Sequence, residues 1–214
     1  FPVDLHTDEA AFDVQFGNLT RKIHRNTSWD EARFESCGQK WMDMSEGHYG
    51  VSLLNDCKYG HSALDGVMTL TLIKSGIEPN PTADQEEHTF TYALYPHAEG
   101  WRQANTVQEA MKLNQPLLSE EGGHAGCQNS FVWVDKSNVI IETVKMAEDD
   151  DGIIVRLYES ENAKTKAHLF FGEKISSVEN CNCLEEIKQT IETDGEGFEI
   201  TIKPYEIQTY RVRF

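Results

Sequence analysis

The stretch Phe12-Asp13-Val14-Gln15-Phe16-Gly17 alternates apolar with polar or small residues, with a period of two. Successive side chains of a β-strand point to opposite faces of the sheet, so this period predicts a strand with one buried face. Similar β-branched and aromatic runs, separated by turn residues, predict an all-β fold of many short strands, an antiparallel β-sandwich. These runs lie at 67–72, 90–95, 131–134, 139–144, 153–158, 168–171, 198–203 and 207–214.

One segment departs from this period. Ala104, Val107 and Met111 fall on a single stripe at helical spacing. The spacing predicts one short amphipathic helix over residues 101–113, which ends at Asn114.

Two stretches predict loops. Residues 73–87 combine Gly and Pro with acidic and amide side chains, which is typical of an exposed loop. Residues 119–129 hold three Gly, which predicts a second loop and a seam between two sheet units within a domain over 1–214. The chain begins with Phe1-Pro2 and no Met, so we expect a piece of a longer protein.

The composition excludes several classes of partner. With 36 acidic against 19 basic residues the formal net charge is −17, and both nucleic acids and anionic membrane surfaces require a basic patch. No apolar run approaches the ~18 residues that a membrane-spanning helix needs. The five Cys are an odd number, which leaves at least one thiol unpaired and favours a reducing compartment, the cytoplasm. Two sequons, at Asn18 and Asn26, argue weakly for the opposite.

Candidate catalytic and metal groups are sparse. His124 and Cys127 form one pair and Cys181 and Cys183 another, whereas a closed zinc site needs four coordinated ligands. Acidic neighbours such as Glu120-Glu121 are expected in so acidic a chain and do not specify a pair of glycosidase carboxylates. The sequence therefore predicts neither a catalytic residue nor a metal ligand.

The densest unusual chemistry lies in residues 20–61. Trp29, Trp41, Tyr49 and Tyr59 are interspersed there with Asn, Asp and Arg. Aromatic rings stack on the C–H groups of sugars while polar side chains bind hydroxyls, so the pattern is typical of a sugar-binding surface. The alternative, in which the Trp residues are core and the polar groups cap turns, is equally open.

The same block carries a resemblance that extends over nearly the whole chain. Its most specific part is Tyr49-Gly-Val-Ser-Leu-Leu-Asn-Asp-Cys-Lys-Tyr-Gly60. The other segments are Phe16-Gly-Asn-Leu-Thr-Arg21, His24-Arg-Asn-Thr-Ser-Trp-Asp-Glu-Ala-Arg-Phe-Glu35, Lys40-Trp-Met-Asp-Met-Ser-Glu46, Thr91-Tyr-Ala-Leu-Tyr-Pro-His97 and Lys203-Pro-Tyr-Glu-Ile-Gln-Thr209. Together they resemble the C-terminal part of family 38 glycoside hydrolases, the class II α-mannosidases, in their cytosolic and bacterial branch.

The resemblance implies a β-rich region of the supersandwich kind behind a catalytic α/β barrel. Members are retaining α-mannosidases in which His and Asp residues hold zinc or another divalent metal and an Asp is the nucleophile, all on the N-terminal part. That part is absent here, so no catalytic residue and no cofactor is carried over, and we expect the chain alone to be inactive. The implied partners are the N-terminal catalytic barrel and, in the full enzyme, a mannoside or glycan substrate.

The positions that match the family motif are Asn55, Asp56, Lys58 and Tyr59. Their neighbours in the resemblance are Trp29, Asp30 and Tyr49. The resemblance implies that these residues face the barrel and line the rim of its sugar pocket. The residues themselves leave a second interpretation open, because an Asn-Asp pair before Lys-Tyr-Gly is also typical of a hairpin turn.

Three functions are therefore weighed. The first is the C-terminal domain of an α-mannosidase, which is inert alone and completes the enzyme. The second is an autonomous carbohydrate-binding module, supported by the aromatic and polar block. The third is a structural or oligomerising domain that forms a homo-oligomer, supported by the lack of a catalytic set.

Overall fold

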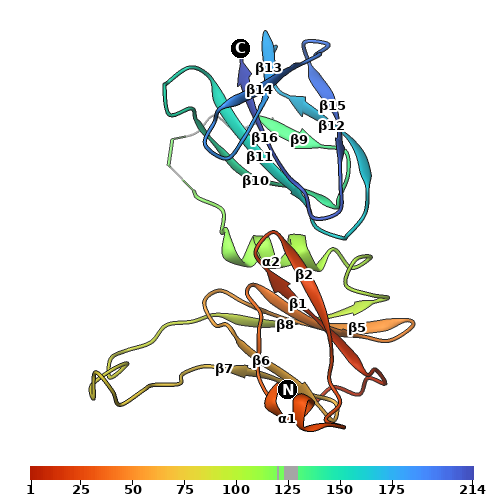
Figure 1. The fold of residues 1–214 in the computed structure, drawn as a ribbon, viewed down its shortest axis with the longest axis vertical. Coiled ribbons are helices and arrows are strands. Elements are labelled where there is room, and N and C mark those ends of the chain that lie inside the picture. Colours follow the sequence, from red (N-terminus) through yellow and green to blue (C-terminus); the bar gives the residue numbers. More distant parts are fainter. Residues whose placement is uncertain (120, 123–129) are drawn as a thin grey trace. The chain divides into compact units, whose positions relative to one another are not determined.

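A computed structural model describes residues 1–119, 121–122 and 130–214. The chain divides into two compact units, Phe1–Leu118 and Ser119–Phe214, in which antiparallel strands predominate (Figure 1). The predicted all-β class and antiparallel sandwich are confirmed. The seam expected at 119–129 falls mostly on residues outside the described ranges and stays a prediction.

Unit 1 contains two antiparallel sheets, with strand orders β2-β1-β4-β5-β8 and β3-β6-β7. Side chains from both sheets, among them Phe12, Met42, Leu53 and Met68, form one buried core. The sheets therefore pack against each other through one face of each. Their strands are β1 (Glu9–Val14), β2 (Gly17–Lys22), β3 (Ser36–Cys37), β4 (Trp41–Ser45), β5 (Tyr49–Asn55), β6 (Gly60–Leu64), β7 (Val67–Thr71) and β8 (Tyr92–Ala98).

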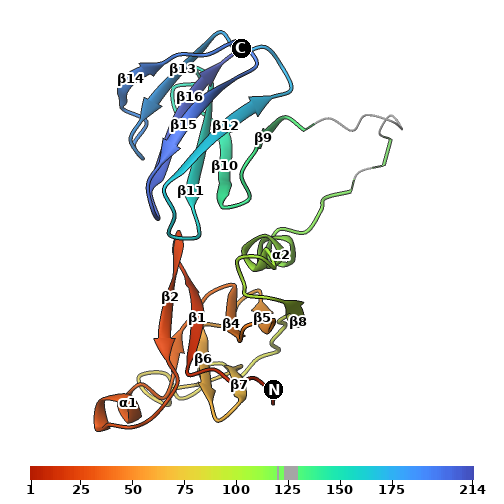
Figure 2. The ribbon, with the colours of Figure 1, turned by 90° about the vertical axis from the view of Figure 1, so that its right-hand side faces the viewer.

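The second face of the larger sheet is covered by α2 (Thr106–Asn114), which contacts β4 and β5 (Figures 1 and 2). Val107 and Ala110 are its buried apolar residues. Of the predicted stripe only Val107 is buried in the helix, since Ala104 precedes it and Met111 is half-buried. The helix begins at Thr106 and not at residue 101, because Asn105 has a left-handed backbone (φ 53°) that interrupts the helical hydrogen bonding.

The expectation of a single helix is wrong, because α1 (Ser28–Ala32) is a second one. It has no buried residue, and five residues are too few to show a stripe. A capping box stabilises its start: the Thr27 side chain accepts from the Asp30 N–H, and the Asp30 carboxylate accepts from the Thr27 N–H. This local polar signal, and not apolar periodicity, specifies α1.

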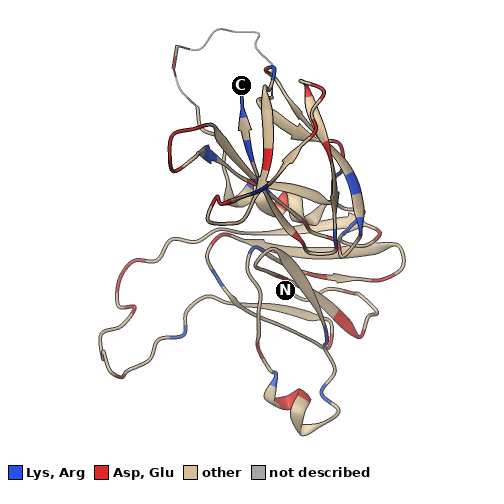
Figure 3. Cartoon of the chain, turned by 45° about the horizontal axis from the view of Figure 1, so that its top comes forward, with Lys and Arg blue, Asp and Glu red and all other residues tan. Residues whose placement is uncertain are grey.

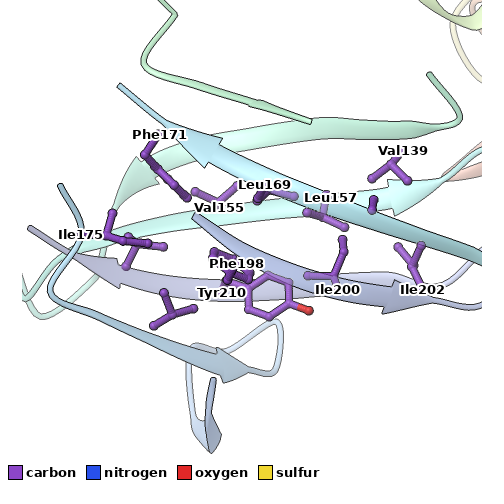
Figure 4. Close-up of a cluster of buried hydrophobic side chains, with 13 residues drawn as sticks. Val139, Val155, Leu157, Leu169, Phe171, Ile175, Phe198, Ile200, Ile202 and Tyr210 are labelled. Atoms are coloured by element: carbon purple, nitrogen blue, oxygen red, sulfur yellow. The ribbon is translucent and has the colours of Figure 1, made fainter. Parts of the chain in front are cut away.

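Unit 2 is a sandwich of a five-stranded sheet, β10-β11-β16-β13-β14, and a three-stranded sheet, β15-β12-β9. Alternate side chains of the two sheets, including Leu157, Leu169, Phe198 and Tyr210, meet in one buried core (Figure 4). The strands are β9 (Val132–Val134), β10 (Val139–Met146), β11 (Ile153–Glu159), β12 (Thr165–Phe171), β13 (Ser177–Cys181), β14 (Ile187–Ile191), β15 (Gly197–Ile202) and β16 (Ile207–Arg213).

The long loop expected at residues 73–87 is present. It contains neither helix nor strand, and nearly all of its residues are exposed. Within the described ranges we find no helix with both the length and the apolar character to cross a membrane.

Candidate functional site

The last residue of β5 and the connection from β5 to β6 contain four of the seven predicted site residues, and Asn55 fixes the shape of the connection. The Asn55 side chain is 1% exposed, and its Oδ1 accepts from the backbone N–H groups of Cys57 (3.2 Å) and Lys58 (2.6 Å). Its Nδ2 donates to the carbonyl oxygen of Gln39 at 2.7 Å. Asn55 therefore holds a tight turn from the inside, in agreement with the turn interpretation of this residue.

The turn does not close a hairpin, which corrects part of that interpretation. Strand β5 pairs with β4 and β8, whereas β6 pairs with β3 and β7 in the other sheet. Residues 56–59 therefore carry the chain from one layer of the sandwich to the other. Turn chemistry in a sequence indicates where the chain reverses, but not which strands pair.

Asp56 is the next residue of the connection and is exposed. Its Oδ1 accepts from the Thr91 N–H at 2.9 Å, and its own N–H donates to the Thr91 carbonyl oxygen. Hydrogen bonds from the Cys57 thiol and from the Thr91 N–H lower the pKa of the Asp56 carboxyl. Asp56 is thus a carboxylate at neutral pH that ties the connection to the start of β8.

Lys58 of the connection and three aromatic rings from other segments lie in a row. The Lys58 Nζ lies 4.9 Å from the centre of the Phe90 ring, Phe90 stacks on Tyr92 at 6.5 Å, and Tyr92 meets Phe1 at 5.4 Å. Tyr59 is 59% exposed and Tyr92 is 45% exposed. We call Asp56, Lys58, Tyr59, Phe90 and Tyr92 the corner surface.

Trp29 and Asp30 lie elsewhere, on α1, with Trp29 80% exposed. Among the described residues, no hydrogen bond or ion pair joins α1 to residues 55–59. Hydrogen bonds from Thr27 and the charges of His24 and Arg33 lower the pKa of Asp30. The cavity beside α1 has a volume of about 20 Å³, room for about one water, so it does not accommodate a sugar ring.

Tyr49 is also separated from the corner surface. It begins β5 whereas Asn55 ends it, and at ~3.3 Å per residue the two lie about 20 Å apart. The structure therefore brings together Asn55, Asp56, Lys58 and Tyr59, but not Tyr49.

A buried polar cluster that the sequence analysis missed lies between the larger sheet of unit 1 and α2. Asp43 Oδ2 accepts from Ser52 Oγ at 2.7 Å and lies 2.8 Å from His97 Nε2. Ser52 Oγ lies 2.8 Å from Thr106 Oγ1 in the first turn of α2. One sequence signal could have predicted this cluster, namely a single polar residue inside an apolar strand. Examples are Met42-Asp43-Met44 and Ser52-Leu53.

This cluster is not a hydrolase triad. A Ser-His-Asp triad uses opposite ring nitrogens of the His, whereas Ser52 and Asp43 both contact Nε2 of His97. Ser52 and Asp43 are also at most 1% exposed, so no substrate reaches them. Burial lowers the pKa of His97, and the hydrogen bond and charge of Asp43 outweigh that effect, so the net shift is upward. The cluster anchors α2 to the sheet.

The structure also bears on metal binding. Within the described ranges, no group of three or more His, Cys, Asp or Glu side chains could hold a metal ion. Cys181 is buried beneath Thr209 and Cys183 is exposed, while Cys37 and Cys57 are also free thiols. His124 and Cys127 lie outside the described residues.

Comparison with known families gives two matches, one in each unit. Residues 1–82 match the family described as "Glycosyl hydrolases family 38 C-terminal domain". Residues 138–210 match "Glycosyl hydrolases family 38 C-terminal beta sandwich domain". The two descriptions fall on the chain in the order in which the two units follow each other.

Curated relatives align over most of the chain. Alpha-mannosidase G of Dictyostelium discoideum is 37% identical over 97% of this chain and 20% of its own length. Alpha-mannosidase 2C1 of Homo sapiens is 38% identical over 86% of the chain and 18% of its own length. Alpha-mannosidase of Saccharomyces cerevisiae is 34% identical over 100% of the chain and 22% of its own length. The chain thus spans about a fifth of these relatives.

A solved structure has the same fold. The crystal structure of an alpha-mannosidase from Enterococcus faecalis V583 superposes with a TM-score of 0.79 at 21% sequence identity. The superposition covers 99% of this chain and 25% of that one.

Proposed function

Because the chain belongs to glycosyl hydrolase family 38, of which it is a C-terminal region, we propose that it serves a retaining, metal-dependent α-mannosidase that hydrolyses terminal α-mannosides. The observation that carries this proposal is the 37% identity to an alpha-mannosidase over 97% of the chain. Similarity of that extent supports a shared role of the region, not only a shared fold.

In this proposal the chain is not itself catalytic. Retaining hydrolysis needs a nucleophile and an acid at a fixed separation, and the described residues contain no group of three or more His, Cys, Asp or Glu that could hold a metal ion. We assign both, with zinc or another divalent metal, to a catalytic barrel in the remainder of the protein. The chain spans about a fifth of its relatives, which is consistent with that division.

The corner surface is the part of the chain that we assign to the barrel. Its exposed Tyr59 and Tyr92 are large apolar groups in water, and such patches are typical of interfaces. Asp56 and Lys58 supply fixed charges at its edge, which suits the polar rim of a sugar pocket. Asn55 beneath them has a structural role, since its side chain is buried and fully engaged.

The first experiment compares the 214-residue chain with the longer protein that contains it. We expect no hydrolysis of a synthetic α-mannoside by the chain, with or without added zinc, and hydrolysis by the longer protein. Turnover by the purified chain that scales with its concentration would contradict the division of roles. A longer protein that cleaves another glycoside, but no α-mannoside, would contradict the assigned activity.

The second experiment tests the corner surface in the longer protein. We expect Tyr59→Ala to lower kcat/KM at least tenfold or to weaken docking of the two parts, seen as an additional early step in thermal unfolding. Ile77→Ala is the matched control, since Ile77 is 77% exposed in the 73–87 loop. If both variants behave like the parent protein, the corner surface does not face the barrel.

The free thiols of four described Cys support our placement of the protein in the cytoplasm. Of the competing functions, carbohydrate binding by the chain itself is favoured by exposed aromatic side chains in unit 2, among them Trp133.

A further inference from the structure

The outer face of the β15-β12-β9 sheet carries a row of aromatic side chains (Figure 2 labels the three strands). Along β12 the residues Ala167, Leu169 and Phe171 point into the core, so His168 and Phe170 between them point outward. Trp133 of β9 is the register partner of Phe170 and shares its face. The row therefore runs from Trp133 through Phe170 to His168.

The rings of the row are in contact with one another: Trp133 stacks on Phe170, and the His168 ring is tilted by 35° to that of Phe170. Trp133 and Phe170 are nearly parallel, at 11°, with centres 5.4 Å apart, and Phe170 and His168 have centres 4.2 Å apart. Trp133 nevertheless remains 42% exposed. Because β9 is the edge strand of its sheet, no strand of that sheet among the described residues flanks Trp133 on the side away from Phe170.

A glycine fixes the other end of the row. A Cβ on Gly197 would overlap the Leu169 carbonyl oxygen and would lie 2.6 Å from His168 Nε2, so only Gly leaves room for the imidazole. His168 Nε2 is buried and has no hydrogen-bond partner among the residues that the structure describes. Its nearest ionic group is Asp194 Oδ2, 3.9 Å away, which is beyond hydrogen-bond distance.

This end of the row opens into a hollow of about 680 Å³, within the size range of ligand pockets. His168, Glu199 and residues 189–194 line it, and they bring carboxylate, amide and hydroxyl groups. Asp194 Oδ1 accepts from the N–H groups of Glu196 and Gly197, which fixes the carboxylate and leaves Oδ2 free to accept from a ligand. These backbone bonds also lower the pKa of Asp194.

The aromatic ring faces and the carboxylates together favour a neutral sugar as the ligand. Aromatic ring faces bind the C–H groups of a pyranose, and carboxylates accept from its hydroxyls. Nucleic acids, phosphorylated ligands and sialylated glycans would meet Glu192, Asp194 and Glu199 in a protein of net charge −17 (Figure 3). An apolar protein partner would leave these carboxylates desolvated and unpaired.

We propose that the outer face formed by Trp133, Phe170 and His168, with the adjoining hollow at Asp194 and Glu199, is a binding site for neutral hexose units of glycans. It is separate from the corner surface, because it lies in unit 2 whereas that surface lies in unit 1. The choice of mannose as the preferred hexose rests on the proposed function. Such a site would hold a glycan near the enzyme by a unit other than the one being cleaved.

The test is a titration of the 214-residue chain with methyl α-mannoside and with an α-linked mannobiose, followed by NMR. The four Trp indole N–H signals report separately, and we expect only that of Trp133 to shift saturably. Trp133→Ala should lower the affinity at least tenfold, and Asp194→Asn should lower it several-fold. Phe214→Ala is the matched control, since Phe214 is 44% exposed in the same unit, and it should leave the affinity unchanged.

A binding free energy of ~4 kcal/mol corresponds to a Kd of about 1 mM. If the Trp133 signal shows no saturable shift up to about 100 mM sugar, a hundredfold above that Kd, the site is overturned. Shifts that persist in Trp133→Ala would overturn it as well. Preferential binding of another neutral hexose would support the site and overturn the choice of mannose. Because the readout is binding by this chain and not hydrolysis by the longer protein, failure of this proposal is distinguishable from failure of the proposed activity.

Discussion

His97 of β8 and Asp43 of β4 meet across the intervening strand β5, with 2.8 Å between His97 Nε2 and Asp43 Oδ2. Ser52 of β5 donates a hydrogen bond to Asp43, and its Oγ also contacts Thr106 Oγ1 at the start of α2. Three strands and a helix are thereby fixed by one carboxylate. A buried carboxylate with this many donors is costly to leave unpaired, so the cluster specifies where α2 docks.

The Asp43–His97 pair predicts a pH dependence of stability. The pKa of His97 is raised in the folded chain, so its contribution is complete below the unfolded value of about 6.5 and is lost as pH rises through the folded value. We expect the melting temperature to fall as pH rises from about 6.5. Asp43→Asn should cost ~3 kcal/mol and flatten this trend, as measured by denaturant unfolding at several pH values.

His48→Ala is the control for that experiment, because His48 is an exposed His on the β4–β5 turn of the same unit. His48→Ala should preserve the fall in melting temperature with rising pH above 6.5. A parent chain whose stability is constant from pH 6.5 to 9 would contradict the role of the pair.

Gly50 predicts a steric effect beside the same cluster. A Cβ at this position would overlap His97 Cε1 and Ser45 Oγ, and neither can move without breaking its contact with Asp43. We expect Gly50→Ala to destabilise the chain by about 2 kcal/mol. Gly47→Ala, three residues earlier where a Cβ has no neighbour within 4 Å, should be nearly neutral. Equal melting temperatures of the two variants would rule out the clash.

Replacement of the buried Asp13 is expected to stabilise the chain. Burial raises the pKa of its carboxyl to about 6, so the folded chain retains a proton that the unfolded chain loses near pH 4. Stability therefore falls between about pH 4 and pH 6. Asp13→Asn keeps the acceptor for the Lys40 N–H and should raise the free energy of unfolding by up to ~3 kcal/mol at pH 7.5, but not at pH 4.

The exposed Asp4→Asn serves as the control for Asp13 and should show no gain at either pH. A loss of stability in Asp13→Asn at pH 7.5 would mean that the ionised carboxylate is the favoured form.

Substitutions of the neighbouring residues Asn55 and Asp56 are expected to have opposite effects on stability. Asn55→Ala removes the acceptor of two backbone N–H groups and should cost ~2 kcal/mol. Asp56→Asn keeps an acceptor for Thr91 at an exposed position and should leave the melting temperature nearly unchanged. A steady-state assay of Asp56→Asn in the longer protein then decides its role, since a well-folded variant with tenfold lower kcat/KM would place Asp56 in the sugar pocket.

The period-two pattern predicted nine of the sixteen strands in the described residues, because alternation reflects which residues face a core regardless of the strand partner, but it missed β2 to β6, β13 and β14. Along β12, for example, the buried residues Ala167, Leu169 and Phe171 alternate with less buried ones, whereas in β1 residues 10–13 are all buried and do not alternate. The same pattern cannot give the pairing: it could not reveal that β5 and β6 belong to different sheets, which made the turn after Asn55 resemble a hairpin.

The candidate site was predictable only where its residues are consecutive. Asn55, Asp56, Lys58 and Tyr59 lie together because the chain joins them, whereas Tyr49 is carried away by the length of β5. Asp43 and His97 are 54 positions apart and meet only through the strand order β4-β5-β8. The row from Trp133 to His168 likewise depends on the pairing of β9 with β12.

The strand order of unit 2 has a consequence for synthesis on the ribosome. Strand β16 follows all the others along the chain, yet it lies at the centre of its sheet, between β11 and β13. Until residues 207–213 emerge, β11 and β13 each present an open edge that is able to pair with another nascent chain. Unit 2 must therefore complete its fold after translation has passed β16. Premature termination before that strand would yield an aggregation-prone product, even though Phe1–Leu118 had been made in full.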